Sequence, residues 1–234
     1  MEFKYNSNKE DCIYKDSCNR KITKGCDSFC LRHYKMQYLI SQSLLSDCDL
    51  KPIALYPDAD GTDLKEFQDL KNICVNIEDF VNSGKNLFLY SKITGNGKTA
   101  WSKKLLLNYF NKIWIKTDFE CRGLFIDLQV FFNKLRENIS NPNDYIKHIT
   151  ENITKADLVI WDEIGIKNIS EYEHGYFLSY LNERLSLGKA NIFTSNLSDN
   201  DLRMRLGDRL YSRIVLNSKN IELKGKDKRL LNKW

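Results

Sequence analysis

The sequence lacks long apolar runs and any mark of an exported protein. No apolar stretch in its 234 residues approaches the ~18 residues that a membrane-spanning helix needs. The first residues, MEFKYNSNKEDC, have no apolar core and therefore do not form a secretory signal. Internal repeats and low-complexity tracts are absent as well. These absences exclude a membrane-spanning protein, a secreted protein and a repeat protein. We therefore expect a cytoplasmic globular protein that does not engage a membrane.

What the sequence does contain is an ordinary globular composition with unevenly placed charge. Hydrophobic residues make up 42% and charged residues 29%, which fits a folded chain. The net charge is +5, but residues 1–84 carry 11 basic against 14 acidic residues, whereas residues 85–234 carry 25 against 17. A basic second part suits an anionic partner such as a nucleotide or nucleic acid, although a solvated lysine-rich surface gives the same balance.

Four of the seven cysteines form a tight cluster near the N-terminus: Cys12, Cys18, Cys26 and Cys30. The surrounding segment is too polar to bury much apolar surface, so something other than a core must order it. In a chain without an export signal, such a cluster indicates a metal site more than disulfides. Four thiolates satisfy a tetrahedral Zn²⁺ ion, which we expect here. An iron–sulfur cluster and unligated cysteines remain the alternatives.

The rest of the chain alternates apolar strands with helices. Four short apolar runs predict strands at residues 86–91, 123–128, 157–163 and 190–196. Helical patterns lie between them, and strands that alternate with helices indicate an α/β fold, a parallel sheet with helices on both faces. We therefore expect three parts: a Cys-rich module at 1–50, a linker at 51–62 and an α/β domain at 63–234.

The loop after the first predicted strand carries a phosphate-binding pattern. It ends in the sequence Gly95-Asn96-Gly97-Lys98-Thr99 and matches G-x-x-x-x-G-K-[ST], except that Lys92 stands at the first glycine position. Glycines let backbone N–H groups approach phosphate oxygens, and the next helix points its N-terminus at them. We expect Lys98 to reach the β- and γ-phosphates and Thr99 to hold Mg²⁺.

Two carboxylates follow the third predicted strand, LVIWDE. A buried parallel strand delivers its carboxyl end to the ligand crevice, so Asp162 is placed to bind Mg²⁺ and Glu163 to polarise an attacking water. The next strand ends in Thr194-Ser195-Asn196, and we expect Asn196 to orient that water, with the two preceding residues as alternatives. Each feature alone is also typical of an ordinary strand end, but their order favours a nucleotide triphosphatase.

A pair of arginines near the C-terminus completes the set. Arg209 and Arg213 are four residues apart and share one helix face if this segment is helical. A guanidinium that reaches a neighbour's γ-phosphate stabilises transition-state charge. Two surface arginines that pair with nearby aspartates would give the same pattern.

In their order and spacing, LFLYSKITGNGKT, LVIWDEIG, NIFTSN and GDRLYSRI resemble the AAA+ ATPases of the DnaC/DnaI helicase-loader group. The similarity is greatest to versions from phages and integrated elements of low-GC Gram-positive bacteria, and it covers about residues 65–234. The resemblance implies an AAA+ P-loop NTPase that uses ATP and Mg²⁺. It further implies an ATP-dependent homo-oligomer that loads a DnaB-type hexameric replicative helicase onto single-stranded DNA during DNA replication.

The same resemblance implies roles for the matching residues. Lys98 and Thr99 take the P-loop roles, and Asp162 and Glu163 the Mg²⁺ and water roles. Asn196 takes the sensor role, and Arg213 that of the arginine finger, with Arg209 as the alternative. The Cys-rich module would then bind the helicase.

Two other readings stay open. The first is an IstB-type transposition helper ATPase that binds duplex DNA, which the zinc-like N-terminus disfavours. The second is a non-catalytic binding module with a decayed nucleotide site, which the intact Lys98, Asp162 and Glu163 disfavour.

Overall fold

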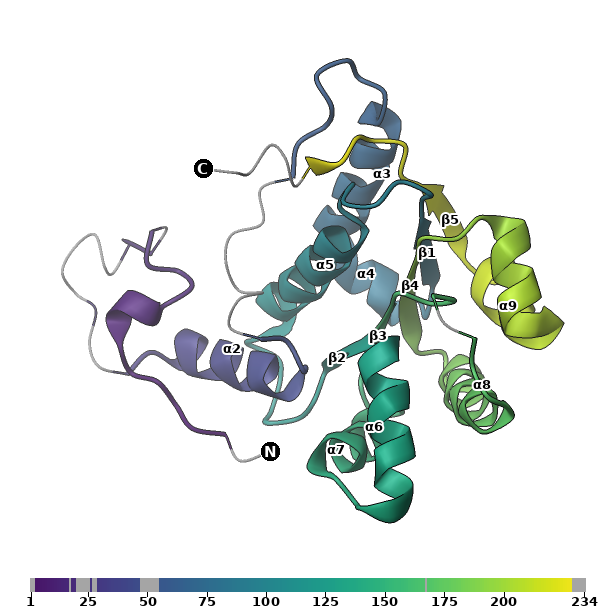
Figure 1. Cartoon of the computed structure of the whole chain (residues 1–234). Coiled ribbons are helices and arrows are strands. Elements are labelled where there is room, and N and C mark those ends of the chain that lie inside the picture. Colours follow the sequence, from purple (N-terminus) through teal and green to yellow (C-terminus); the bar gives the residue numbers. More distant parts are fainter. Residues whose placement is uncertain are drawn as a thin grey trace.

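Five parallel strands form the centre of the molecule (Figure 1). The computed structural model describes residues 3–16, 18–19, 26, 29–46, 55–166 and 168–228. Their strands are β1 (Asn86–Tyr90), β2 (Gly123–Asp127), β3 (Leu158–Asp162), β4 (Ala190–Ser195) and β5 (Lys219–Glu222). The order across the sheet is β2-β3-β4-β1-β5, so β4 is central, with β3 and β1 on either side of it. This sheet confirms the predicted α/β class.

Four strands lie where the apolar runs placed them, and the fifth was not predicted. Nearly every residue of β1 to β4 is buried, as expected for parallel strands covered on both faces. The sequence of β5 is KNIE, in which only Ile221 is buried. An edge strand with one apolar residue leaves no recognisable pattern in the sequence.

Helices cover both faces of the sheet (Figure 1). They are α2 (Leu31–Gln42), α3 (Leu64–Val75), α4 (Ile77–Asn82), α5 (Lys98–Ile113), α6 (Leu128–Ser140), α7 (Asp144–Asn152), α8 (Glu171–Ser186) and α9 (Asp199–Tyr211). Helices α2 to α5 share one buried cluster and α6 to α9 the other. Alternate strand residues enter opposite clusters: Leu87 and Leu89 belong to the first and Phe88 to the second.

After β4, α9 consists of two helical segments that meet at a kink. At this kink Gly207 has a φ of 72° and a ψ of 162°, which are not helical. Helix α9 continues directly into the π-helix η3 (Ser212–Leu216), which carries Arg213. Single π-helical turns are frequent at functional sites.

Helix α2, which we assigned to the N-terminal module, packs against the body of the α/β domain. Met36 and Leu39 are buried in the same cluster as α5, and the backbone N–H of Phe125 in β2 donates to the carbonyl oxygen of Ser43 at 2.8 Å. The division into three parts stays a prediction. Residues 47–54, which include the start of the expected linker, lie outside the described residues.

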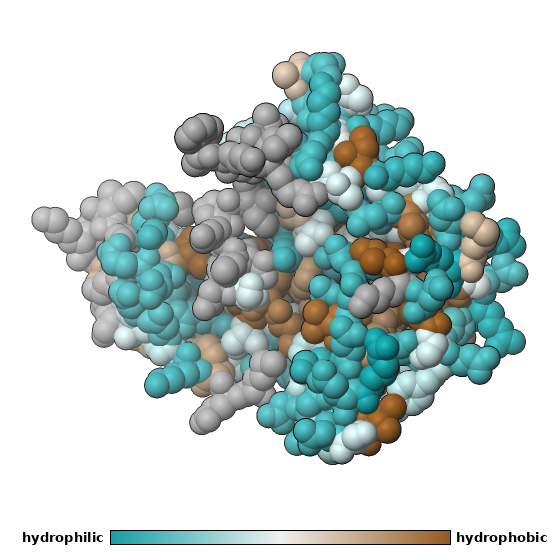
Figure 2. Space-filling view, in the orientation of Figure 1, coloured by the Kyte–Doolittle hydropathy of each residue, from teal (hydrophilic) through white to brown (hydrophobic). Residues whose placement is uncertain are grey.

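No helix among the described residues is long and apolar enough to cross a bilayer. On the face shown in Figure 2, hydrophilic residues dominate and hydrophobic residues form separate patches between them.

Candidate nucleotide site

The glycine-rich loop connects β1 to α5, which is the setting that a phosphate-binding loop requires. Gly95 and Gly97 have φ values of 74° and 104°, in the left-handed region that favours glycine. Gly97 immediately precedes α5, so the helix N-terminus opens at the loop. Lys92, the departure from the pattern, is exposed and does not prevent the loop from closing.

The side chain of Lys98 lies inside this loop and is 7% exposed. Its Nζ is 2.9 Å from the carbonyl oxygen of Ile93 and 3.2 Å from Oδ1 of Asn96. A third oxygen, the carbonyl of Ser91, is 3.4 Å away. The ammonium is therefore held at the loop by oxygens of the loop itself, where incoming phosphate oxygens would replace them.

Thr99 and Asp162 form a pair of oxygen donors beside the loop. The Thr99 hydroxyl lies 3.1 Å from each carboxylate oxygen of Asp162, at the end of β3. Hydroxyl and carboxylate oxygens are the ligands that Mg²⁺ prefers, so the two residues fit the expected ion. Asp162 is 4% exposed, and burial, opposed by hydrogen bonds from Thr194 and Thr99, raises its pKa to about 6. A cation at this position would remove that penalty.

Glu163 is held in an unusual conformation next to Asp162. Its φ of 63° is left-handed, which is rare for a residue with a side chain and is typical of strained functional positions. Its backbone N–H donates to Oγ1 of Thr194 at 2.9 Å, and its carboxylate accepts from Nε2 of Gln129 at 2.9 Å. Glu163 is thus fixed by β4 on one side and by the first turn of α6 on the other.

Two further residues hold the carboxylates: Thr194, which the sequence analysis gave as an alternative to Asn196, and Gln129, which it did not assign. The Thr194 hydroxyl donates to Asp162 at 2.6 Å while it accepts from Glu163, so it joins both carboxylate residues. The pairing of the strands could have indicated Thr194. Trp161 in β3 pairs with Phe193 in β4, so the next residues along the two strands, Asp162 and Thr194, lie side by side. Gln129 has no signal beyond its place after the carboxyl end of β2.

The remaining predicted residues are not linked to this centre by the contacts of the described residues. Asn196 follows β4 and is partly exposed, and no contact recorded for the described residues links it to Asp162. Arg209 is exposed near the end of α9. Arg213 donates through Nε to Oδ1 of Asn182 in α8. Their assigned roles stay predictions.

The raised pKa of Asp162 predicts a specific dependence of stability on pH. Between its ordinary value of 3.8 and about 6, the folded protein holds a proton that the unfolded chain releases. The fold therefore becomes more stable as pH falls through that window. Above it, the buried Asp162 carboxylate lowers the free energy of unfolding by an amount on the order of 2 kcal/mol. Asp162→Asn should raise the melting temperature at pH 7.5 and change it little at pH 4.

Thermal unfolding without nucleotide tests this, with the exposed Asp118→Asn as control. Asn keeps an oxygen that can accept from Thr194, so the packing should survive. An Asp162→Asn protein that melts below the parent at pH 7.5 would contradict the expected burial penalty.

The four clustered cysteines form no disulfide among the described residues. Burial, together with the neighbouring thiols of Cys30, Cys18 and Cys26, raises the pKa of Cys12. In the part of the chain that the structure describes, no three His, Cys, Asp or Glu side chains are arranged to hold a metal. The predicted zinc site is thus not shown.

Comparisons with known proteins agree with the fold. Residues 35–234 match the model of the family described as IstB-like ATP binding protein. A crystal structure of the DnaC helicase loader has a TM-score of 0.59 and 18% identity over 72% of this chain and 93% of its own. One of DnaI has 0.59 and 18% over 80% and 95%. A putative primosome component from Streptococcus pyogenes has 0.59 and 17% over 81% and 96%. No curated protein matches significantly.

Proposed function

The chain belongs to the family of IstB-like ATP-binding proteins, and we propose that it is an ATPase that loads a DnaB-type replicative helicase onto single-stranded DNA. The observation that carries the ATPase part is the joining of Lys98, Thr99, Asp162 and Glu163 at one edge of the sheet. The loader part is supported by the similarity in fold to DnaC and DnaI and by the resemblance of the motifs.

The residues divide the work of hydrolysis between them. The N–H groups of the glycine-rich loop and the Lys98 ammonium bind the triphosphate, while Thr99 and Asp162 would hold Mg²⁺, which neutralises phosphate charge when bound. Glu163 accepts the proton of the attacking water, and Thr194 keeps its backbone in place. Gln129 must release or share the carboxylate when that water binds, since it occupies one of the two oxygens.

Purification with a hexameric replicative helicase tests the loader proposal. The protein should co-purify with the helicase and, with ATP, place it on single-stranded DNA that has no free end. A protein that hydrolyses ATP but neither binds the helicase nor changes its loading would contradict this function and leave the ATPase intact.

A second function is favoured by the family match itself. An IstB-type transposition helper would bind duplex DNA in the presence of ATP, with no need of a helicase. A filter-binding comparison of duplex and single-stranded DNA separates the two. Tight ATP-dependent binding to duplex DNA alone would favour the transposition helper.

We also propose that Cys12, Cys18, Cys26 and Cys30 bind one zinc ion and order the helicase-binding end of the chain. Elemental analysis of the purified protein should find one zinc per chain, and iron would indicate a cluster instead. Cys26→Ser should lose the metal and the order of residues 1–35 and keep nucleotide affinity, because the nucleotide site is built by β1, α5 and β3 of the α/β domain. A metal-free protein with an ordered N-terminus would contradict the site.

The arginines should act between copies of the chain. Arg213→Ala should keep nucleotide affinity in a single chain and weaken ATP-dependent assembly, because a finger acts on a neighbour's γ-phosphate. Mixing Arg213→Ala with Lys98→Ala protein should restore part of the ATPase activity, since each variant supplies the half that the other lacks. The same mixture with Arg209→Ala identifies which arginine is the finger. Loss of nucleotide binding by monomeric Arg213→Ala would show that it acts within its own chain.

A further inference from the structure

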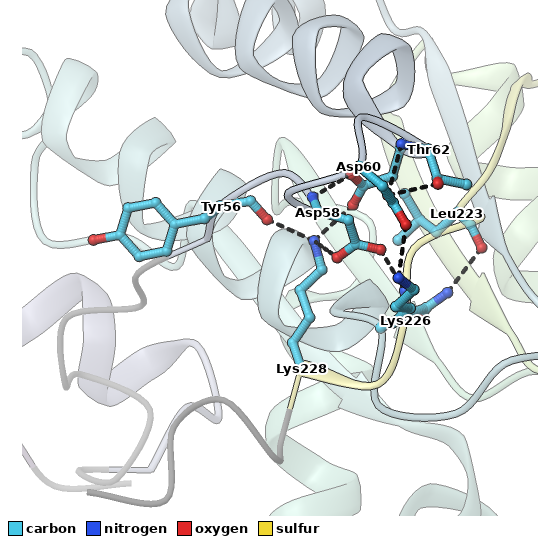
Figure 3. A network of polar contacts seen from close by, with 9 residues as sticks. Tyr56, Asp58, Asp60, Thr62, Leu223, Lys226 and Lys228 are labelled. Carbon is cyan, nitrogen blue, oxygen red and sulfur yellow. Dashed lines mark hydrogen bonds and ion pairs between the residues drawn. The ribbon is translucent and has the colours of Figure 1, made fainter.

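A network of charged residues joins two segments that are far apart in the sequence (Figure 3). One segment, residues 55–63, leads into α3, and the other, residues 223–228, follows β5. The Lys228 Nζ lies 2.6 Å from Oδ2 of Asp63, 2.6 Å from the carbonyl oxygen of Tyr56 and 3.6 Å from Oδ1 of Asp58. We call the contacts between these two segments the latch.

Burial separates the strong part of the latch from the weak part. The side chains of Lys228, Asp58 and Asp63 are 14%, 5% and 8% exposed, so their mutual attraction is little screened by water. The second ion pair, from Lys226 to Asp60 at 2.6 Å, is exposed at both ends and contributes little. Removal of one partner of the buried group would leave an uncompensated charge.

The packing around Gly225 shows how closely the segments fit. A Cβ at this position would lie 2.5 Å from Oδ2 of Asp63 and 3.3 Å from Oδ2 of Asp58. The Asp58 carboxylate also accepts from the backbone N–H of Lys226 at 2.7 Å. The Asp58 carboxylate therefore binds the backbone of the second segment as well as the Lys228 side chain.

The latch also contacts the glycine-rich loop at consecutive residues. The backbone N–H of Lys228 donates to the carbonyl oxygen of Gly95 at 2.9 Å, and Nδ2 of Asn96 donates to the carbonyl oxygen of Leu223 at 2.8 Å. A Cβ at Gly97 would lie 3.5 Å from Cδ2 of Leu55. Gly95, Asn96 and Gly97 belong to the loop whose backbone N–H groups would bind the phosphates in the proposed nucleotide site.

We propose that the latch sets the shape of the phosphate-binding loop and couples it to the chain segment that enters α3, with Lys228 as the positioning residue. The coupling rests on the proposed nucleotide site, because its purpose is to change nucleotide affinity. When the latch is closed, the loop keeps the geometry that binds the triphosphate. Displacement of residues 55–63 opens the latch and lowers nucleotide affinity.

Hydrogen exchange of the full-length protein, without nucleotide, tests the latch independently of the ATPase. In Lys228→Met, the amides of residues 91–99 should exchange roughly tenfold faster than in the parent. Lys228→Arg should restore most of the protection. The matched control is Lys224→Met in the same segment, whose ammonium lies 3.7 Å from Glu66 in α3 and makes no contact with Asp58 or Asp63 in the described structure. Unchanged exchange in Lys228→Met overturns the proposal.

Nucleotide binding supplies the reciprocal measurement. A non-hydrolysable ATP analogue should slow exchange at residues 55–63 in the parent and not in Lys228→Met, since coupling acts equally in both directions. The variant should also bind the analogue roughly tenfold more weakly, with kcat at saturating ATP within about twofold of the parent. A lower kcat with unchanged affinity would overturn the positioning role.

Two further measurements separate a failure of the proposed ATPase, or of the variant to fold, from a failure of the latch. If the parent binds no nucleotide, the proposed ATPase fails, while exchange at residues 91–99 still decides the latch. If Lys228→Met does not fold, Asp63→Asn, which preserves the side-chain shape, is tested in its place with the same expected exchange.

Discussion

Lys98→Ala should abolish ATP binding. The side chain supplies the buried ammonium at the glycine-rich loop, and its Nζ already contacts the oxygens of Ile93 and Asn96. Alanine removes the charge that would compensate the β- and γ-phosphates, at a site where water is scarce. We expect affinity to fall by at least about 100-fold, on the order of 3 kcal/mol, consistent with the loss of a hydrogen-bonded charge.

Titration with a fluorescent ATP analogue measures this loss, and Lys92→Ala is the matched control. Lys92 belongs to the same loop but is exposed, so its removal should change affinity no more than a few-fold. Equal losses in the two variants would mean that loop charge in general, and not the placement of Lys98, binds the phosphates.

Glu163→Gln should keep nucleotide affinity and lose turnover. The amide has nearly the shape of the carboxylate but cannot accept the proton of the attacking water, so kcat should fall by about 100-fold or more. Binding should be unchanged, because Lys98, Thr99 and Asp162 remain. Single-turnover hydrolysis and analogue titration on the same preparation separate the two quantities.

The control for this variant is Glu171→Gln, an exposed glutamate at the start of α8. It should hydrolyse ATP at nearly the parent rate. A Glu163→Gln protein that does the same would remove Glu163 from the reaction and return attention to Thr194 and Gln129, which hold it.

The sequence predicted the structure best at positions where the local backbone conformation or burial requires one type of residue. Gly95 and Gly97 adopt left-handed backbone conformations next to a helix start, and such positions can be recognised from the pattern alone. The apolar strands were equally clear, because burial on both faces requires nearly every residue to be apolar. By contrast, β5 exposes three of its four residues, so its sequence carries no comparable requirement.

Contacts between distant segments could not be predicted in this way. Lys228 and Asp63 are 165 residues apart, and neither is distinguishable from an ordinary surface charge until the fold brings them together. Gln129 meets Glu163 only because β2 and β3 are neighbours in the sheet. We ranked Thr194 behind Asn196 as the residue that orients the attacking water. The choice between them depends on the register of β3 and β4, which the spacing of apolar residues does not determine.

The bond between Phe125 and Ser43 affects how the chain behaves when it is shortened. Strand β2 lies at the end of the sheet, and an uncovered edge of this kind is a template on which a strand of another molecule can add. The segment after α2 covers that edge, with the Ser43 carbonyl oxygen bound to the Phe125 N–H. A protein trimmed to begin at Leu55 would keep the latch and the phosphate-binding loop but lose this cover, and its solubility would decrease through aggregation along β2.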